Sequence, residues 1–264
     1  MKKDRAAFLL VFLFMLGSCY TEPEIISDSY TPQVNPLTGT WRAEDGGYWV
    51  FKGDGTGGRA EDETAEPEDT FSYLYWQGRG AGVKPSQGLN TLVTAGGDSS
   101  DAAAATVKQY IFTQNSNGTV TLTPQNLELQ GNDYYRVTPD TAAAFTLTRV
   151  SGGAGALSLN NPLIGEWHAD WNGSEHDGSV PTWSYKFRTD GTVRTYHHGL
   201  HQFDNGYLVR NKVLVLLGEW RFDNSLGYTS STITLGADGN FTAKEFHHGA
   251  LEWVFRRVDA AVWK

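Results

Sequence analysis

The chain carries one short motif twice, as Asn35-Pro-Leu-Thr-Gly-Thr-Trp41 and again as Asn161-Pro-Leu-Ile-Gly-Glu-Trp167. Two further motifs recur in the same order behind each copy. They are Phe51-Lys-Gly-Asp-Gly-Thr56 with Phe187-Arg-Thr-Asp-Gly-Thr192, and Phe145-Thr-Leu-Thr-Arg-Val150 with Trp253-Val-Phe-Arg-Arg-Val258. Because each framed segment is far longer than the unit of a solenoid, the pattern indicates a duplicated domain. We place the two copies at residues 35–150 and 161–258.

Apolar and polar residues alternate within each copy, which is typical of strands with one buried face. In the second copy, for example, Trp183, Tyr185 and Phe187 share one face of such a strand. Tight hairpin turns are predicted at the Asx-Gly pairs between these segments: Asp54-Gly55, Asn117-Gly118, Asp190-Gly191, Asn205-Gly206 and Asp238-Gly239. We therefore predict an all-β fold with two tandem small antiparallel β-barrels, each of about eight strands.

A glycine-rich stretch at residues 151–160 separates the two copies and is predicted to be a flexible linker. Since this stretch carries little apolar surface, we expect no large hydrophobic interface between the copies. The two domains are then expected to unfold in separate transitions. Residues 259–264 are assigned to a C-terminal tail.

The N-terminus has the features of a secretory signal. A charged start and an apolar run at residues 6–16, too short to span a bilayer, precede Cys19, the chain's only cysteine. The residues Leu16-Gly17-Ser18-Cys19 resemble the bacterial lipobox, in which the cysteine is acylated and becomes the first residue of the mature chain. The resemblance implies a signal peptide at 1–18 and a lipidated, polar tether at 19–34. An ordinary signal peptide with an incidental cysteine is the alternative.

The lipobox resemblance implies an envelope protein that is lipid-anchored at the outer membrane or cell surface rather than at the inner membrane. The formal net charge of −9 argues against nucleic acid as a partner, because no basic surface is available to neutralise phosphates. The same acidic surface repels anionic lipid headgroups, so membrane contact is expected to come from the lipid.

Each copy resembles the small bacterial lipocalin-like domains. The matching features are a Gly-x-Trp at the first strand, an Asp-Gly-Thr hairpin and an arginine in the last strand. The resemblance implies that Arg149 covers Trp41 and that Arg257 covers Trp167, closing one end of each barrel. A guanidinium over an indole face is worth about 0.5 to 2 kcal/mol. The copies are shorter than typical lipocalins. An alternative is therefore a barrel that is filled by its own side chains and whose loops alone carry the function.

Histidines are the second notable feature, since all seven lie in the second copy. Imidazole is a common ligand of zinc and copper, and two similar histidine-rich pieces would form an open site if their strand ends meet at one rim. The candidate ligands are His197, His198, His201, His247 and His248. Turns with solvated histidines are the alternative.

No motif for nucleophilic catalysis or phosphate binding is present, so we predict no enzyme, no catalytic residue and no cofactor. Three functions stay open: binding of a small apolar or aromatic ligand in a barrel, interaction with or inhibition of a protein partner through loops, and metal binding. For the first, the predicted lining residues are Trp183, Tyr185, Phe187, Trp253 and Phe255. Large aromatic residues are also common in cores. We expect the second barrel to be the better binder and the first to favour display over enclosure.

Overall fold

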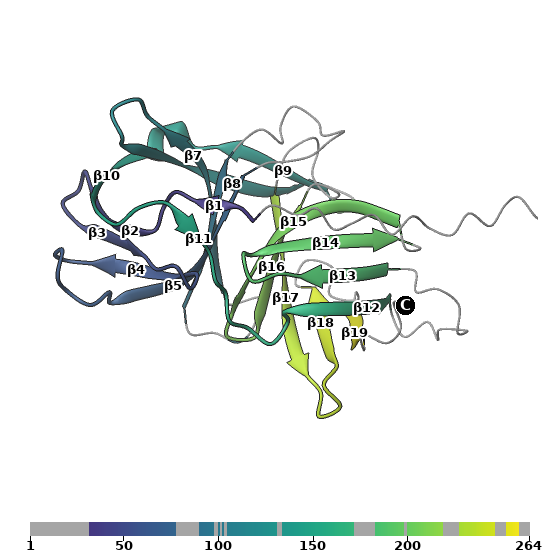
Figure 1. Ribbon diagram of the computed structural model, residues 1–264. Coiled ribbons are helices and arrows are strands. Elements are labelled where there is room, and N and C mark those ends of the chain that lie inside the picture. Colours follow the sequence, from purple (N-terminus) through teal and green to yellow (C-terminus); the bar gives the residue numbers. More distant parts are fainter. Residues whose placement is uncertain are drawn as a thin grey trace, which may run out of the picture. The chain divides into compact units, whose positions relative to one another are not determined.

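Two β-barrels in tandem make up the folded part of the chain (Figure 1). The computed structural model describes residues 32–77, 90–97, 100, 102, 105–130, 134–171, 183–197, 200–218, 227–245 and 252–258, all within the unit Pro32–Lys264. Cys19, the predicted signal peptide at 1–18 and the tail at 259–264 lie outside the described residues. Within the described ranges, no helix has both the length and the apolar character needed to cross a membrane. The predicted all-β fold with two tandem barrels is confirmed.

The first barrel is an antiparallel ring in which each strand pairs with the next along the chain. Its strands are β2 (Gly39–Ala43), β3 (Tyr48–Phe51), β4 (Thr56–Ala60), β5 (Asp69–Trp76), β6 (Thr91–Gly96), β7 (Thr106–Gln114), β8 (Val120–Gln130) and β10 (Phe145–Ser151). β10 pairs with both β8 and β2 and so closes the ring. The strand β9 (Tyr134–Pro139) pairs with the second half of β8, and the short 3-10 helix η2 (Thr141–Ala143) separates it from β10.

The second barrel repeats this order and is closed by the pairing of its first and last strands. Its strands are β12 (Gly165–Trp171), β13 (Trp183–Phe187), β14 (Thr192–His197), β15 (Leu200–Arg210), β16 (Val213–Gly218), β17 (Gly227–Leu235), β18 (Phe241–Glu245) and β19 (Glu252–Arg257). Closure leaves no unpaired edge in the ring, which is how a small all-β domain avoids strand addition.

The predicted Asp-Gly turns occur at equivalent places in the two barrels. Asp54 Oδ1 accepts hydrogen bonds from Thr56 N (2.9 Å) and Thr56 Oγ1 (2.6 Å), and Asp190 Oδ1 does the same for Thr192 (3.1 and 2.8 Å). The glycine that follows each aspartate has a positive φ of about 80°, which only glycine adopts without strain.

The turn predicted at Asn205-Gly206 is wrong, because both residues lie inside the strand β15. Gly206 serves close packing instead of a turn. A Cβ atom at this position would collide with the Leu74 side chain on β5 of the other barrel. Glycine in a strand interior often marks such a close approach of another segment.

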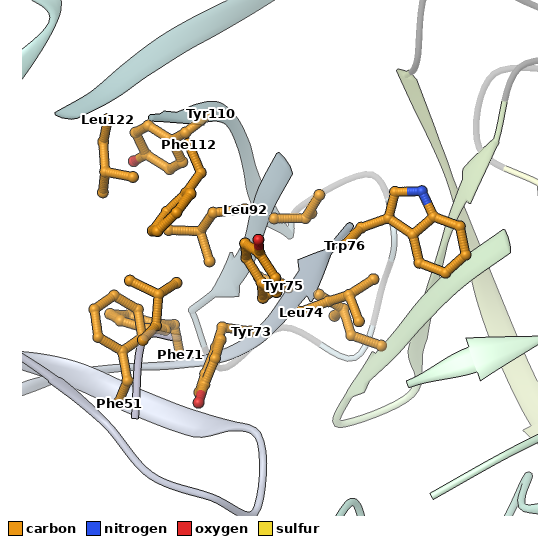
Figure 2. Close-up of a cluster of buried hydrophobic side chains, with 14 of the residues drawn as sticks. Phe51, Phe71, Tyr73, Leu74, Tyr75, Trp76, Leu92, Tyr110, Phe112 and Leu122 are labelled. Atoms are coloured by element: carbon orange, nitrogen blue, oxygen red, sulfur yellow. The ribbon is translucent and has the colours of Figure 1, made fainter. Parts of the chain in front are cut away.

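The two barrels share a hydrophobic interface, so the expectation that they share none is wrong. On β5 the side chains alternate, with Tyr73 and Tyr75 inside the first barrel and Leu74 and Trp76 outside it. Figure 2 shows Trp76 pointing away from the Phe51 and Tyr73 side of the cluster. One buried cluster contains these outward residues of the first barrel together with outward residues of the second: Leu74, Trp76, Val93 and Ala95 with Leu208, Val213, Val215 and Leu217.

Polar contacts fix the same interface. Tyr228 Oη donates a hydrogen bond to Val107 O (3.1 Å), and Arg210 Nη2 donates one to Thr70 Oγ1 (2.9 Å). Burial raises the pKa of Tyr228, so its phenol remains a donor over the physiological pH range. The contacts join β17 to β7 and β15 to β5.

The predicted linker is part of the folded body rather than a flexible join. β11 (Gly155–Ala156) pairs with β1 (Val34–Asn35), and the next residues hold Leu157 and Leu159 in buried positions. Ser158 N donates to Gly53 O in the first barrel, whereas Leu159 N donates to Thr189 O in the second. The segment is thus hydrogen-bonded to a turn of each barrel.

The tether also ends earlier than the sequence suggested. Gln33 is buried, and its backbone N–H donates to Asp190 Oδ2 (3.3 Å). Its side-chain Oε1 accepts a hydrogen bond from Gln77 N (3.0 Å). Gln33 therefore belongs to the folded body and contacts both barrels, and Val34 pairs with Ala156 of β11.

Candidate functional site

A tryptophan and an arginine lie together at one end of each barrel. The Arg149 guanidinium carbon lies 4.1 Å from the centre of the Trp41 ring, and that of Arg257 lies 5.6 Å from the Trp167 ring. Both tryptophans are 1% exposed, and the indole N–H of each donates to a backbone carbonyl four residues earlier at 2.6 Å. Burial lowers the pKa of Arg149, which also donates to the carbonyls of Thr38 and Pro36. This end of each barrel is closed.

An asparagine and a buried tyrosine complete each closed end, and sequence reasoning missed them. Asn161 Nδ2 donates to Tyr207 Oη (3.3 Å), and Tyr207 Oη donates to Arg188 O (2.8 Å). Burial raises the pKa of Tyr207, although the hydrogen bond with Asn161 acts in the other direction. The signal that was available is the asparagine that begins the repeated motif, here Asn161 and in the first copy Asn35.

Aromatic rings fill the second barrel next to this closed end. The Phe241 and Phe255 rings stack with centroids 4.3 Å apart, and the Trp167 and Phe187 rings meet their neighbours edge to face. Such packed rings form a solid floor.

The five predicted lining residues belong to one hydrophobic cluster inside the second barrel. Phe187 and Phe255 are buried in the floor, and the Tyr185 ring lies 5.3 Å from Phe255. Trp183, Tyr185 and Trp253 are only half-buried although the register places them on the inner face. Half-buried inward rings above a buried floor form an apolar wall open at one end.

Strand register matches the inner residues of the two barrels one by one. Tyr73 and Tyr207 donate from their backbone N–H groups to the glycine of the equivalent turn, Gly55 and Gly191, which fixes the alignment. When the strand pairings are counted from this turn in both barrels, four inner positions of the first barrel have an equivalent in the second. These are Arg59 with Thr195, Phe71 with Asn205, Tyr110 with Ser231 and Leu122 with Ala243. The same path matches Phe145 with Trp253, as the repeated motif does.

In the first barrel, the larger residues at these positions gather around Trp49. The rings of Phe71, Tyr110 and Phe145 lie 5.6, 6.4 and 5.6 Å from the Trp49 ring, and the Arg59 guanidinium carbon lies 5.6 Å from it. Figure 2 shows the side chains of Phe71, Tyr110 and Leu122 among the buried residues of this core. These side chains therefore pack against one another inside the first barrel.

At the four equivalent positions the second barrel has smaller residues, of which Thr195 pairs with Tyr185. Replacing a phenylalanine, a tyrosine, a leucine and an arginine by Asn205, Ser231, Ala243 and Thr195 removes much side-chain volume from one layer. Native interiors are close-packed, so such a loss at one level leaves space unless another group enters. These four exchanges lower the side-chain volume at their positions, whereas Val193 in place of Gly57 and Trp253 in place of Phe145 raise it.

One buried polar atom in this layer is unsatisfied. Thr195 is 1% exposed, and within the described part of the chain its Oγ1 makes no hydrogen bond. A buried hydroxyl without a partner costs about 1 to 3 kcal/mol, so native structures rarely keep one without a reason. An unmet hydroxyl on the inner face of a barrel is a group that a ligand can satisfy.

The first barrel has a cavity that is lined in part by residues of its inner face. A cavity of about 780 Å³ is lined by Trp49, Tyr110 and Phe145 together with Arg59 and Lys108. Arg59 is held there by an ion pair with Asp45 (2.9 Å). The expectation that this barrel favours display over enclosure therefore missed a partly enclosed space.

The histidine candidates fall largely outside the described residues, as His198, His247 and His248 do. His197 ends β14, and His201 lies on β15 opposite Tyr196. Among the residues that the structure describes, no group of three or more histidine, cysteine, aspartate or glutamate side chains is placed to hold a metal ion.

Comparison with known proteins gives no family for this chain. No protein-family model matches it, and no curated protein matches it significantly in sequence. Among solved structures, the endo-1,5-alpha-L-arabinanase from Thermotoga petrophila RKU-1 is 12% identical, with a TM-score of 0.25 over 87% of this chain and 68% of the arabinanase. A TM-score this low does not relate the two folds, so the site is interpreted from its own geometry.

Proposed function

We propose that this chain is a lipid-anchored envelope protein, without catalytic activity, that holds a small apolar or aromatic molecule in the lumen of its second barrel. The observation that carries the proposal is the set of four smaller residues on the inner face of the second barrel, where the first barrel has larger ones. Trp183, Tyr185 and Trp253 supply an apolar wall beside these residues. Small-molecule sites are mostly apolar concave spaces with a few polar groups, which is the composition found here.

The anchoring half of the proposal rests on the sequence around Cys19. Acylation at this cysteine would hold the barrels at a membrane surface, because stable attachment needs more than one acyl chain and the lipobox resemblance implies several. A binding protein held in this way would collect or deliver apolar molecules of low solubility at the envelope.

The proposed ligand binding is tested by substituting residues of the second barrel with the larger residues found at the equivalent positions of the first. We expect the mature chain with Cys19→Ser, which lacks the lipid, to bind about one equivalent of a small fluorescent aromatic probe and to show quenched tryptophan emission. Ser231→Tyr and Ala243→Leu should abolish saturable binding while the chain still folds. Thr234→Leu, at an exposed position of the same strand β17, is the control and should bind like the parent. Equal binding by the filled variants would exclude the lumen as the site.

Metal binding is a second candidate because the strands next to the histidine-rich segments end at one rim. The chain leaves β14 and enters β15 at the rim where it also leaves β18 and enters β19, since each strand in the meander runs opposite to the last. A zinc titration of the parent and of the variant with alanine at 197, 198, 247 and 248 tests it. The same weak binding by both proteins would exclude a histidine site.

A further inference from the structure

The inner face of the second barrel holds three uncharged polar residues at one level, Thr195, Asn205 and Ser231, which we call the polar belt. They occupy the positions that Arg59, Phe71 and Tyr110 occupy around Trp49 in the first barrel. Trp253 occupies the position that Phe145 has beside Trp49, and Trp183 is the next inward residue along β13 from Tyr185. The lumen therefore presents apolar and polar side chains next to one another.

We propose that the ligand is a small amphipathic molecule whose neutral hydrogen-bonding group, a hydroxyl or an amide, reaches the polar belt and pairs with Thr195. This inference rests on the proposed function and adds the class of ligand to it. The Thr195 hydroxyl is buried, lies on the inner face opposite Tyr185 and makes no hydrogen bond among the described residues. A hydroxyl group both donates and accepts, so it can pair with either kind of partner.

The charges around the belt select against an anionic group. The three belt residues carry no charge, the arginine of the first barrel is replaced by Thr195, and the register pairs Ser231 with Glu245. A buried carboxylate without a counter-charge is strongly disfavoured, whereas a hydroxyl that replaces its water contacts by hydrogen bonds is not. The ligand's aromatic or apolar part then lies against Trp183, Tyr185 and Trp253.

Three probes with the same ring system separate these requirements. 2-Methylnaphthalene is apolar, 2-naphthalenemethanol adds a neutral hydroxyl, and 2-naphthoate carries a carboxylate. Binding to the mature Cys19→Ser chain is followed by tryptophan quenching and by calorimetry. We expect the alcohol to bind about five- to tenfold more tightly than the hydrocarbon, which is the effect of one satisfied buried hydrogen bond. The carboxylate should bind more weakly than the alcohol.

Thr195→Val keeps the shape of the side chain and removes only its hydroxyl. In this variant the alcohol should lose its advantage and bind like the hydrocarbon, whose own affinity is kept. Thr234→Val, at an exposed position of β17, is the matched control and should keep the preference. Saturable but equal binding of alcohol and hydrocarbon by the parent would overturn the ligand class alone. Tighter binding of naphthoate than of the alcohol would also overturn it. No saturable binding of any of the three probes would instead overturn the lumen site.

Discussion

The side-chain amide of Asn35 donates a 2.7 Å hydrogen bond to the phenol oxygen of Tyr73, which lies on the distant strand β5. Tyr73 Oη in turn donates to Lys52 O (2.9 Å), and Asn35 Oδ1 accepts from Leu37 N (2.9 Å). One asparagine thus ties the entry of the barrel to its first hairpin and to its core. The second barrel repeats the arrangement with Asn161 and Tyr207, so the duplicated motif encodes the closed end of a barrel.

Asn35→Ala should therefore destabilise the chain by about 1 to 3 kcal/mol, because Leu37 N and Tyr73 Oη both lose a buried partner. Chemical denaturation measures the loss. Asn126→Ala, at an exposed position of β8, is the control and should leave the midpoint unchanged. An Asn35→Ala chain as stable as the parent would show that the amide is not part of the closure.

Stability should fall at alkaline pH through Tyr73. Burial raises its pKa from 10.0 to about 12, so the folded state holds the phenol proton more tightly than the unfolded state does. The resulting stabilisation is complete below the unfolded pKa of about 10 and is lost as the pH rises through the folded value. Denaturation midpoints at about pH 9 and about pH 11.5 should differ, and Tyr73→Phe should reduce the difference. A midpoint that does not change across this range would contradict the prediction.

The two barrels should unfold together. Leu74 and Trp76 of the first barrel are buried in one cluster with Leu208 and Val215 of the second, and a shared core of this kind couples the two units. Calorimetry should show a single transition, and Trp76→Ala should lower it as a whole by about 3 to 5 kcal/mol. Two separate transitions, of which Trp76→Ala moves only one, would restore the view of independent domains.

Two buried threonines on β14 should respond in opposite directions to the same change. Thr192 Oγ1 donates to Asp190 Oδ1 (2.8 Å), so Thr192→Val should destabilise the chain by about 1 to 2 kcal/mol. Thr195 Oγ1 has no partner among the described residues, so Thr195→Val should be neutral or stabilising by about 1 kcal/mol without ligand. Thermal denaturation compares the pair directly. A similar loss in both would mean that the Thr195 hydroxyl is satisfied within the protein.

Cys19→Ser should leave the protein unprocessed or release it from the membrane, since acylation needs the thiol. Detergent phase separation measures the distribution, and mass spectrometry of the parent should find the acyl chains on the residue. Ser18→Ala is the nearby control and should partition like the parent. Unchanged membrane partition of Cys19→Ser would argue for a different mode of attachment.

Sequence reasoning reached the barrels because the information is local. Alternation of residues such as Trp183, Tyr185 and Phe187 fixes which side faces the core, and the Asp-Gly pairs fix two equivalent hairpins. The recurrence of Gly-x-Trp and a last-strand arginine also indicated which residues would meet at the closed end.

The contacts between the barrels were missed because strands that are buried on both faces lose their alternation. In the continuous apolar run at 214–217, Leu214 and Leu216 face the lumen whereas Val215 and Leu217 face the other barrel. The pair Asn205-Gly206 predicts a turn, because the close approach of Leu74 to Gly206 is not visible in the sequence of one strand. The unsatisfied Thr195 could not be predicted, since hydrogen bonding depends on the whole surrounding layer.

The central claim is that the lumen of the second barrel holds a small ligand at the polar belt. A crystal structure of the chain soaked with 2-naphthalenemethanol tests it most directly. The account predicts the naphthalene ring against Tyr185 and Trp253, with the hydroxyl oxygen within hydrogen-bond distance of Thr195 Oγ1. A lumen closed by protein side chains, or a probe bound only in the cavity of the first barrel beside Trp49 and Arg59, would contradict it.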